Sequence, residues 1–136
     1  MVEITARYEG NLRCSLTHGP SGATILTDAP KDNQGEGAAF SPTDLVAAAL
    51  PACMMTIMGI VAKRHGMDLT GMTAVATKEM VSAPMRRIGR VVTRITVPLP
   101  ATHPQRQMLE QAAHTCPVHR SLLAEVDAPI EFVWKG

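Results

Sequence analysis

Hydrophobic and polar positions in the first quarter of the chain form short strand-like runs separated by turn residues. The predicted strands are Ile4 to Tyr8, Leu12 to Leu16 and Ala23 to Thr27. Glu-Gly-Asn at positions 9–11 and Gly-Pro-Ser-Gly at positions 19–22 are typical turn sequences. The pattern therefore predicts a three-stranded meander, followed at positions 28–39 by a surface loop rich in Pro, Gly, Asp and Asn.

The pattern then changes to a long run that is apolar nearly all round, from Leu45 to Ala62. Ser41 is a typical N-cap residue, Pro42 suits the first helical position, and Asp44 places a negative charge in the first turn. Gly66 follows a basic last turn and is expected to end the helix. A helix that is apolar on all sides is expected to be buried on most of them.

The rest of the chain predicts two longer strands, two helices and a final strand. Their ranges are 71–82 and 86–97 for the strands, about 103–115 and 117–124 for the helices, and 129–134 for the last strand. The order of three strands, helix, two strands, two helices and strand predicts an α+β fold. With no internal repeat, we expect one domain that spans residues 1–136.

Composition narrows the possible functions. Apolar residues make up 46% of the 136 residues and charged residues 18%, which is typical of a folded globular protein. The net charge is +1 and aromatic residues are only 3%, so the chain lacks both the basic surface and the stacking side chains of a nucleic-acid-binding protein.

The chain carries no pattern that predicts export or a membrane span. No cationic start precedes an apolar run, as a secretory signal would require. Pro51 and Thr56 interrupt the long apolar run, which lies at the lower edge of membrane-spanning length, so we predict a core helix. Three cysteines, an odd number, favour free or redox-active thiols in a reducing, cytoplasmic location.

Cys53 and Cys116 are the candidate reactive residues. Cys53 lies in the middle of the long helix, where a cysteine often only fills space, but Pro51 removes a backbone donor just before it. Cys116 precedes Pro117, so it is expected to cap a helix whose dipole would lower the pKa of the thiol. The alternative is that Cys116 has only a capping role.

Two thiols that meet in a folded protein have a definite redox chemistry. One thiolate attacks a peroxide and becomes a sulfenic acid, the other thiol condenses with it to a disulfide, and an external dithiol restores the pair. The attacking thiolate requires a nearby cation, and the cation requires a carboxylate. Arg13 and Asp44 are candidates for these two roles by residue type alone.

Other chemistry-bearing residues allow different interpretations. Cys14 follows Arg13 in a predicted strand, so its side chain should point to the opposite face, and we interpret it as structural. His114, Cys116 and His119 suggest a zinc site, which His103 or Cys53 would have to complete. Pro117 disturbs the spacing of these ligands, and solvated histidines are the competing interpretation.

Two segments resemble motifs of the OsmC/Ohr family, the osmotically inducible and organic hydroperoxide resistance proteins. Residues 41–53, SPTDLVAAALPAC, resemble the cysteine-bearing helix of that family, and residues 113–122, AHTCPVHRSL, resemble its second cysteine segment. The order of strands and helices also fits, so the resemblance covers essentially the whole chain. Together the two motifs, about sixty residues apart in the expected order, are quite specific.

The resemblance implies a fold and a set of roles. It implies antiparallel sheets packed around a long central helix in an intertwined homodimer, with two sites at the interface. Cys53 would be the peroxide-attacking thiol, Cys116 the resolving thiol and Arg13 the catalytic arginine. This assignment conflicts with the thiolate environment expected at Cys116, and we follow the resemblance because a guanidinium can outweigh a helix dipole.

The sequence also departs from the family pattern. Thr43 stands where well-characterised peroxidase members have glutamate, and the acid of this chain, Asp44, is one place later and one methylene shorter. Pro51 replaces a small residue.

The expected function is a thiol peroxidase that reduces organic hydroperoxides with an external dithiol and no bound cofactor. The alternatives are a protein of the same fold that binds a small ligand or senses redox state, and a zinc-binding module.

Overall fold

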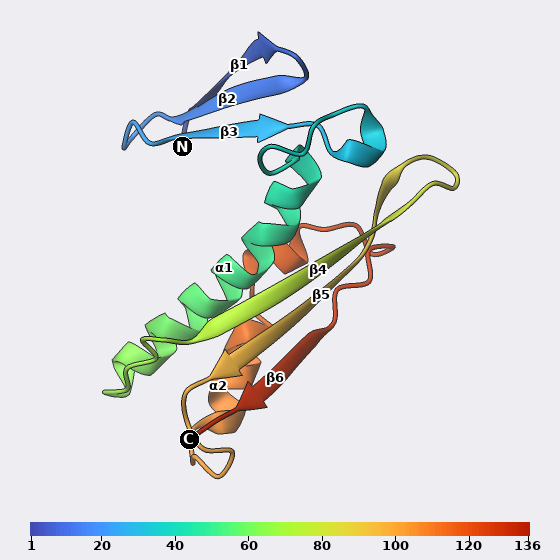
Figure 1. Ribbon diagram of the computed structural model, residues 1–136. Coiled ribbons are helices and arrows are strands. Elements are labelled where there is room, and N and C mark those ends of the chain that lie inside the picture. Colours follow the sequence, from blue (N-terminus) through green and yellow to red (C-terminus); the bar gives the residue numbers. More distant parts are fainter. The chain divides into compact units, whose positions relative to one another are not determined.

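The computed structural model describes all 136 residues, which form two compact units, residues 1–46 and residues 47–136. The first unit contains β1 (Ile4–Gly10), β2 (Arg13–His18), β3 (Thr24–Asp28), the short 3₁₀ helix η1 (Lys31–Asn33) and the first turn of α1. The remaining elements are α1 (Pro42–Arg64), β4 (Thr73–Val81), β5 (Arg87–Val97), α2 (Arg106–Ala113), α3 (Pro117–Arg120) and β6 (Ile130–Trp134) (Figure 1). The predicted α+β class and the element order are confirmed.

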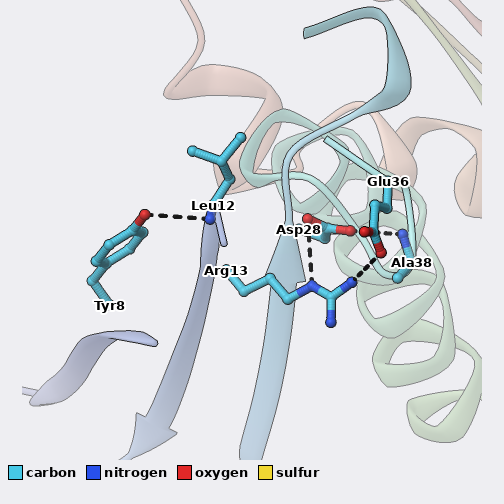
Figure 2. Close-up of polar contacts among 6 residues, drawn as sticks. All are labelled: Tyr8, Leu12, Arg13, Asp28, Glu36 and Ala38. Carbon is cyan, nitrogen blue, oxygen red and sulfur yellow. Dashed lines mark hydrogen bonds and ion pairs between the residues drawn. The ribbon is translucent and has the colours of Figure 1, made fainter. Parts of the chain in front are cut away.

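Strands β1, β2 and β3 form the predicted antiparallel meander in that order. The turn between β1 and β2 is tight, because Asn11 and Leu12 both have positive φ angles, of 53° and 62°. The backbone N–H of Leu12 donates to the Oη of Tyr8 at 3.3 Å (Figure 2). This turn fixes the start of β2 and with it the position of Arg13.

The second sheet has the order β4-β5-β6 and differs in one respect from the prediction. Strands β4 and β5 are antiparallel, as expected, but β6 runs parallel to β5. The expectation of purely antiparallel sheets is therefore wrong for this pair. Parallel pairing follows from the connection, because α2 and α3 carry the chain back to the end of the sheet at which β5 began.

One face of α1 packs into the core of the second unit. Its buried side chains recur every three or four residues and are Ala47, Leu50, Met54, Met58 and Ala62. They pack with residues of β5 and α2, including Val91, Ile95, Val97, Leu109 and Ala113. Within one chain, burial is confined to this face, since Val46 and Ile60 on the other side remain 38% and 47% exposed.

Helix α1 is also long and apolar enough, by length and composition, to cross a membrane. The same composition is common in core helices. Here the periodic burial against β5 and α2 accounts for the apolar residues on one face.

Two helix boundaries differ from those expected. Helix α2 begins at Arg106, because residues 100–105 form turns in which the N–H of Gln105 donates to Nδ1 of His103 at 3.1 Å. Helix α3 is a single turn that ends at Arg120, followed by further turns before β6.

Candidate thiol site

Helix α1 carries Cys53 and is held at its start by a reciprocal cap. The backbone N–H of Asp44 donates to Oγ of Ser41 at 3.1 Å, and the N–H of Ser41 donates to Oδ2 of Asp44 at 2.9 Å. This is a capping box in which aspartate takes the place of the usual glutamate. The predicted capping role of Ser41 is confirmed, and Asp44 has a structural role that the spacing of the two residues could have revealed. Cys53 is half-buried and packs against the core of the second unit.

Cys116 is the N-cap of α3, and Pro117 is the first helical residue, as predicted. Its Sγ accepts a hydrogen bond from the backbone N–H of His119 at 3.4 Å. The side chain of His119 is directed elsewhere, because its Nε2 lies 3.0 Å from the carbonyl oxygen of Ala128. Cys116 is completely buried, which the sequence did not predict.

The two thiols come together within the second unit. Burial raises the pKa of Cys116, and a hydrogen bond with the thiol of Cys53 raises it further. The N–H of His119 acts in the opposite direction but has a smaller effect. The prediction of a lowered pKa at Cys116 is therefore wrong, because burial in the core outweighs the field of a four-residue helix. Cys116 is therefore a protonated thiol at neutral pH.

Arg13 belongs to the first unit, where it is held by two carboxylates. Its Nη2 lies 2.7 Å from Oε2 of Glu36 and its Nε 3.7 Å from Oδ1 of Asp28 (Figure 2). Asp28 is buried, and its Oδ2 accepts the backbone N–H of Ala38 at 2.9 Å. This N–H, together with the Arg13 guanidinium, lowers the pKa of Asp28. Arg13 therefore faces a carboxylate that stays ionised.

Sequence reasoning missed both Asp28 and Glu36. Asp28 could have been found, because residues equally distant from the centre of the turn at 19–22 face each other in β2 and β3, and Arg13 and Asp28 are such a pair. Glu36 lies in the loop before α1, where no pattern predicts a partner. The role expected for Asp44, to orient Arg13, stays a prediction.

Arg13 Nε and Asp28 Oδ1 share one further property. Both atoms are buried and neither makes a hydrogen bond. On this side the guanidinium is therefore paired with Asp28 by charge, at 3.7 Å, and not by a hydrogen bond.

The remaining candidates do not form a second site. Cys14 lies in β2 opposite Tyr8 and Thr27 and is a half-buried free thiol. The chain brings together no group of three His, Cys, Asp or Glu side chains that could hold a metal ion. The zinc alternative therefore lacks the ligand set that it requires within one chain.

Comparison with protein families gives one match of broad extent. The profile of the family described as OsmC-like protein matches residues 35–131, well over half of the chain. A search of curated proteins found no match.

Solved structures share the whole fold. A protein from Psychrobacter arcticus 273-4, provisionally named for an osmotic stress induced and detoxification response, is 40% identical over 97% of this chain and 96% of its own, with a TM-score of 0.90. The organic hydroperoxide resistance protein OhrB of Bacillus subtilis is 21% identical over 97% of each chain, with a TM-score of 0.69. An OsmC-like protein from Mycoplasma pneumoniae is 14% identical over 100% of this chain and 98% of its own, with a TM-score of 0.82.

Proposed function

Because the chain belongs to the OsmC-like protein family, we propose that it reduces organic hydroperoxides through a cycle of Cys53 and Cys116. The observation that carries this proposal is the meeting of two free thiols in unlike surroundings. Cys53 is half-buried at the edge of the core, and Cys116 is fully buried. An attacking and a resolving cysteine need this difference.

In the first step, the thiolate of Cys53 attacks the distal oxygen of the hydroperoxide. The O–O bond breaks, Cys53 becomes a sulfenic acid, and the second oxygen leaves with a proton as an alcohol. Cys53 is the attacking residue because it is the more accessible of the two thiols and because the pKa of its neighbour is raised.

In the second step, Cys116 resolves the sulfenic acid. Its sulfur bonds to the sulfur of Cys53, and its proton leaves with the sulfenic hydroxyl as water. Burial keeps Cys116 in the thiol form, so it does not compete for the peroxide, and its contact with Cys53 places it for the condensation. An external dithiol then reduces the disulfide by exchange, and the chain needs no bound cofactor for any step.

Arg13 supplies the positive charge that stabilises the Cys53 thiolate in this proposal. Asp28 and Glu36 hold its guanidinium. Asp44 remains a candidate for a supporting role at the start of α1.

We also infer a homodimer. The sheet of the first unit has almost no buried apolar side chain, and Ile4, Tyr8, Ile25 and Leu26 are exposed. Helix α1 exposes Val46 and Ile60 on the face opposite its core residues. Apolar area of this kind on a chain of 136 residues calls for a covering partner. A second copy of the chain is the partner that the family fold favours, with the sites at the interface and the protein in the cytoplasm.

Related proteins indicate the substrate class. OhrB of Bacillus subtilis is named for resistance to organic hydroperoxides. The apolar residues around the thiol pair, such as Met54 and Leu50, favour alkyl over hydrogen peroxide.

The deciding experiment is a comparison of reductants and oxidation products. Stoichiometric cumene hydroperoxide should give a mass loss of two hydrogens and one disulfide that links Cys53 and Cys116. Turnover should be faster with a dithiol such as dihydrolipoamide than with a monothiol at equal thiol concentration. A disulfide that involves Cys14, or no disulfide at all, would contradict the proposal.

A further inference from the structure

Cys116 is held differently on its two sides along the chain. Before it, Leu109 and Ala113 of α2 are buried in the core, and the backbone N–H of Cys116 donates to the carbonyl oxygen of Ala113 at 3.3 Å. After it, α3 is one turn of four residues, which is too short to be stable by itself. The position of the Cys116 sulfur therefore depends on the contacts that α3 makes with other elements.

His119 connects the sulfur of Cys116 to a separate segment of the chain. Its backbone N–H donates to Sγ of Cys116 at 3.4 Å, and its ring Nε2 lies 3.0 Å from the carbonyl oxygen of Ala128. A carbonyl oxygen can only accept, so Nε2 carries the proton and is the donor. Val118 and Leu122 also pack against the core, but apolar contacts have no fixed direction. The imidazole therefore gives α3 a directed contact with the rest of the second unit.

The segment that contains Ala128 is fixed to β5. The carbonyl oxygen of Asp127 accepts the backbone N–H of Val91 at 2.8 Å, and that of Pro129 accepts the N–H of Thr93 at 3.0 Å. Val91 and Thr93 are buried residues of β5, the strand against which α1 packs. The two helices that position the thiol pair are therefore both held by this strand.

Disulfide formation depends on the accuracy of this arrangement. The thiols of Cys53 and Cys116 already share a hydrogen bond, but a disulfide requires the two sulfurs to approach to about 2 Å with a specific torsion angle. A misplacement of about 1 Å can lower the rate of such a reaction by about a hundredfold. As the sulfur of Cys116 loses its proton, the hydrogen bond from the N–H of His119 becomes stronger, because its acceptor gains negative charge.

We propose that His119 is the positioning residue of the resolving thiol, and that its imidazole, bonded to Ala128, holds Sγ of Cys116 against Cys53. The inference rests on the proposed function, because it assigns a residue to the second step of that reaction. In this step the S–O bond of the Cys53 sulfenic acid breaks and the S–S bond forms. The proton of Cys116 leaves with the hydroxyl as water, and the imidazole exchanges no proton.

Treatment of the full-length protein with excess cumene hydroperoxide tests the proposal. The sulfenic acid of Cys53 either condenses with Cys116 or reacts with a second peroxide to give a sulfinic acid. Mass spectrometry measures the ratio of sulfinic acid to disulfide, which depends on the rate of the second step and not on that of the first. His119→Phe keeps a ring but removes the donor, and should raise this ratio by about fivefold to tenfold, the scale of one hydrogen bond.

The first step and two further variants serve as controls. The rate of peroxide consumption at limiting peroxide should be unchanged in His119→Phe, whereas a variant that failed to fold would lose it. His119→Gln places an amide N–H near the position of Nε2 and should keep the ratio within about twofold of the wild type. Ser121→Ala removes a hydrogen bond that stays within this turn, from the hydroxyl to the carbonyl oxygen of Pro117 at 2.8 Å, and should leave the ratio unchanged.

The wild type tests the proposed function, and the variants test this inference. If the wild type forms no disulfide between Cys53 and Cys116, the proposed function fails and this inference fails with it. With a normal wild type, an unchanged ratio in His119→Phe would overturn the inference alone. An equal rise in His119→Gln would do the same, because the ring would then act otherwise than as a donor to Ala128. Equal slowing of the first step in His119→Phe, or an equal rise of the ratio in Ser121→Ala, would also contradict a specific role at the resolving thiol.

Discussion

In the first unit, residues 1–46, an arginine is paired with two carboxylates, whereas in the second unit, residues 47–136, two thiols meet at the edge of an apolar core. Arg13 is paired with Asp28 and Glu36 on a sheet whose apolar side chains remain exposed. Cys116 lies among fully buried residues such as Leu50 and Met54.

Because of this difference, neither unit has all the groups that the proposed peroxide reduction requires. An apolar core keeps a thiol protonated, which suits a resolving cysteine and does not suit an attacking one. A paired guanidinium can stabilise a thiolate but cannot react with a peroxide. In the proposed reaction, the first unit supplies charge, the second supplies sulfur, and neither is sufficient.

The largest expected effect comes from removal of one sulfur. Cys53→Ser should lower peroxide turnover by roughly a thousandfold or more, because removal of a catalytic nucleophile typically lowers kcat by at least this factor. Cys116→Ser should also lose turnover with a dithiol, but should still consume one equivalent of peroxide and trap a sulfenic acid that dimedone labels. Cys14→Ser is the matched control and should retain activity. Dimedone labelling of Cys53→Ser but not of Cys116→Ser would reverse the roles of Cys53 and Cys116.

The next effect concerns the faces that a single chain leaves exposed. Ile60→Glu would place a charge on the apolar face of α1 and should weaken the dimer by about a hundredfold, because an unpaired buried charge costs several kcal/mol. Analytical ultracentrifugation over a concentration series measures the shift. Leu123→Glu changes an apolar residue outside α1 that is 70% exposed, and it should leave the dimer intact. If the wild type sediments as a monomer at all concentrations, the inferred dimer is wrong.

A smaller effect should separate the two thiols by their ionisation. The raised pKa of Cys116 means that its thiolate forms only above the ordinary range of a cysteine. Iodoacetamide should therefore label Cys53 first at pH 7, with Cys116 slower by about tenfold or more, and the gap should narrow as the pH rises. Peptide mapping over a pH series follows both rates. Faster labelling of Cys116 at pH 7 would mean that the helix dipole outweighs burial after all.

The sequence predicted correctly those features that depend on residues next to each other in the chain, such as helix caps. Pro117 after Cys116 gave the helix cap, and Ser41 with Pro42 gave the start of α1. The pKa of Cys116 could not be predicted in the same way, because it depends on burial by residues from other elements. The parallel pairing of β6 was missed because no local pattern reports the direction in which a crossover returns.

The smallest expected effect concerns the support of Arg13. Since the pKa of Asp28 is lowered by the N–H of Ala38 and by Arg13, its contribution to stability is present above the ordinary aspartate value of 3.8 and is lost as the pH falls through the lowered pKa. Asp28→Asn should therefore reduce the free energy of unfolding at pH 7. It should also make the fall of this free energy below pH 4 less steep, as measured by urea denaturation at each pH. Glu36→Gln removes the other, exposed partner of Arg13 and should change the acid limb less. If peroxide turnover also falls in Asp28→Asn but not in Glu36→Gln, the buried carboxylate is the one that positions the guanidinium. Identical pH profiles of Asp28→Asn and the wild type would show that the ionisation of Asp28 does not contribute to folding stability, and the first unit would then hold Arg13 by Glu36 alone.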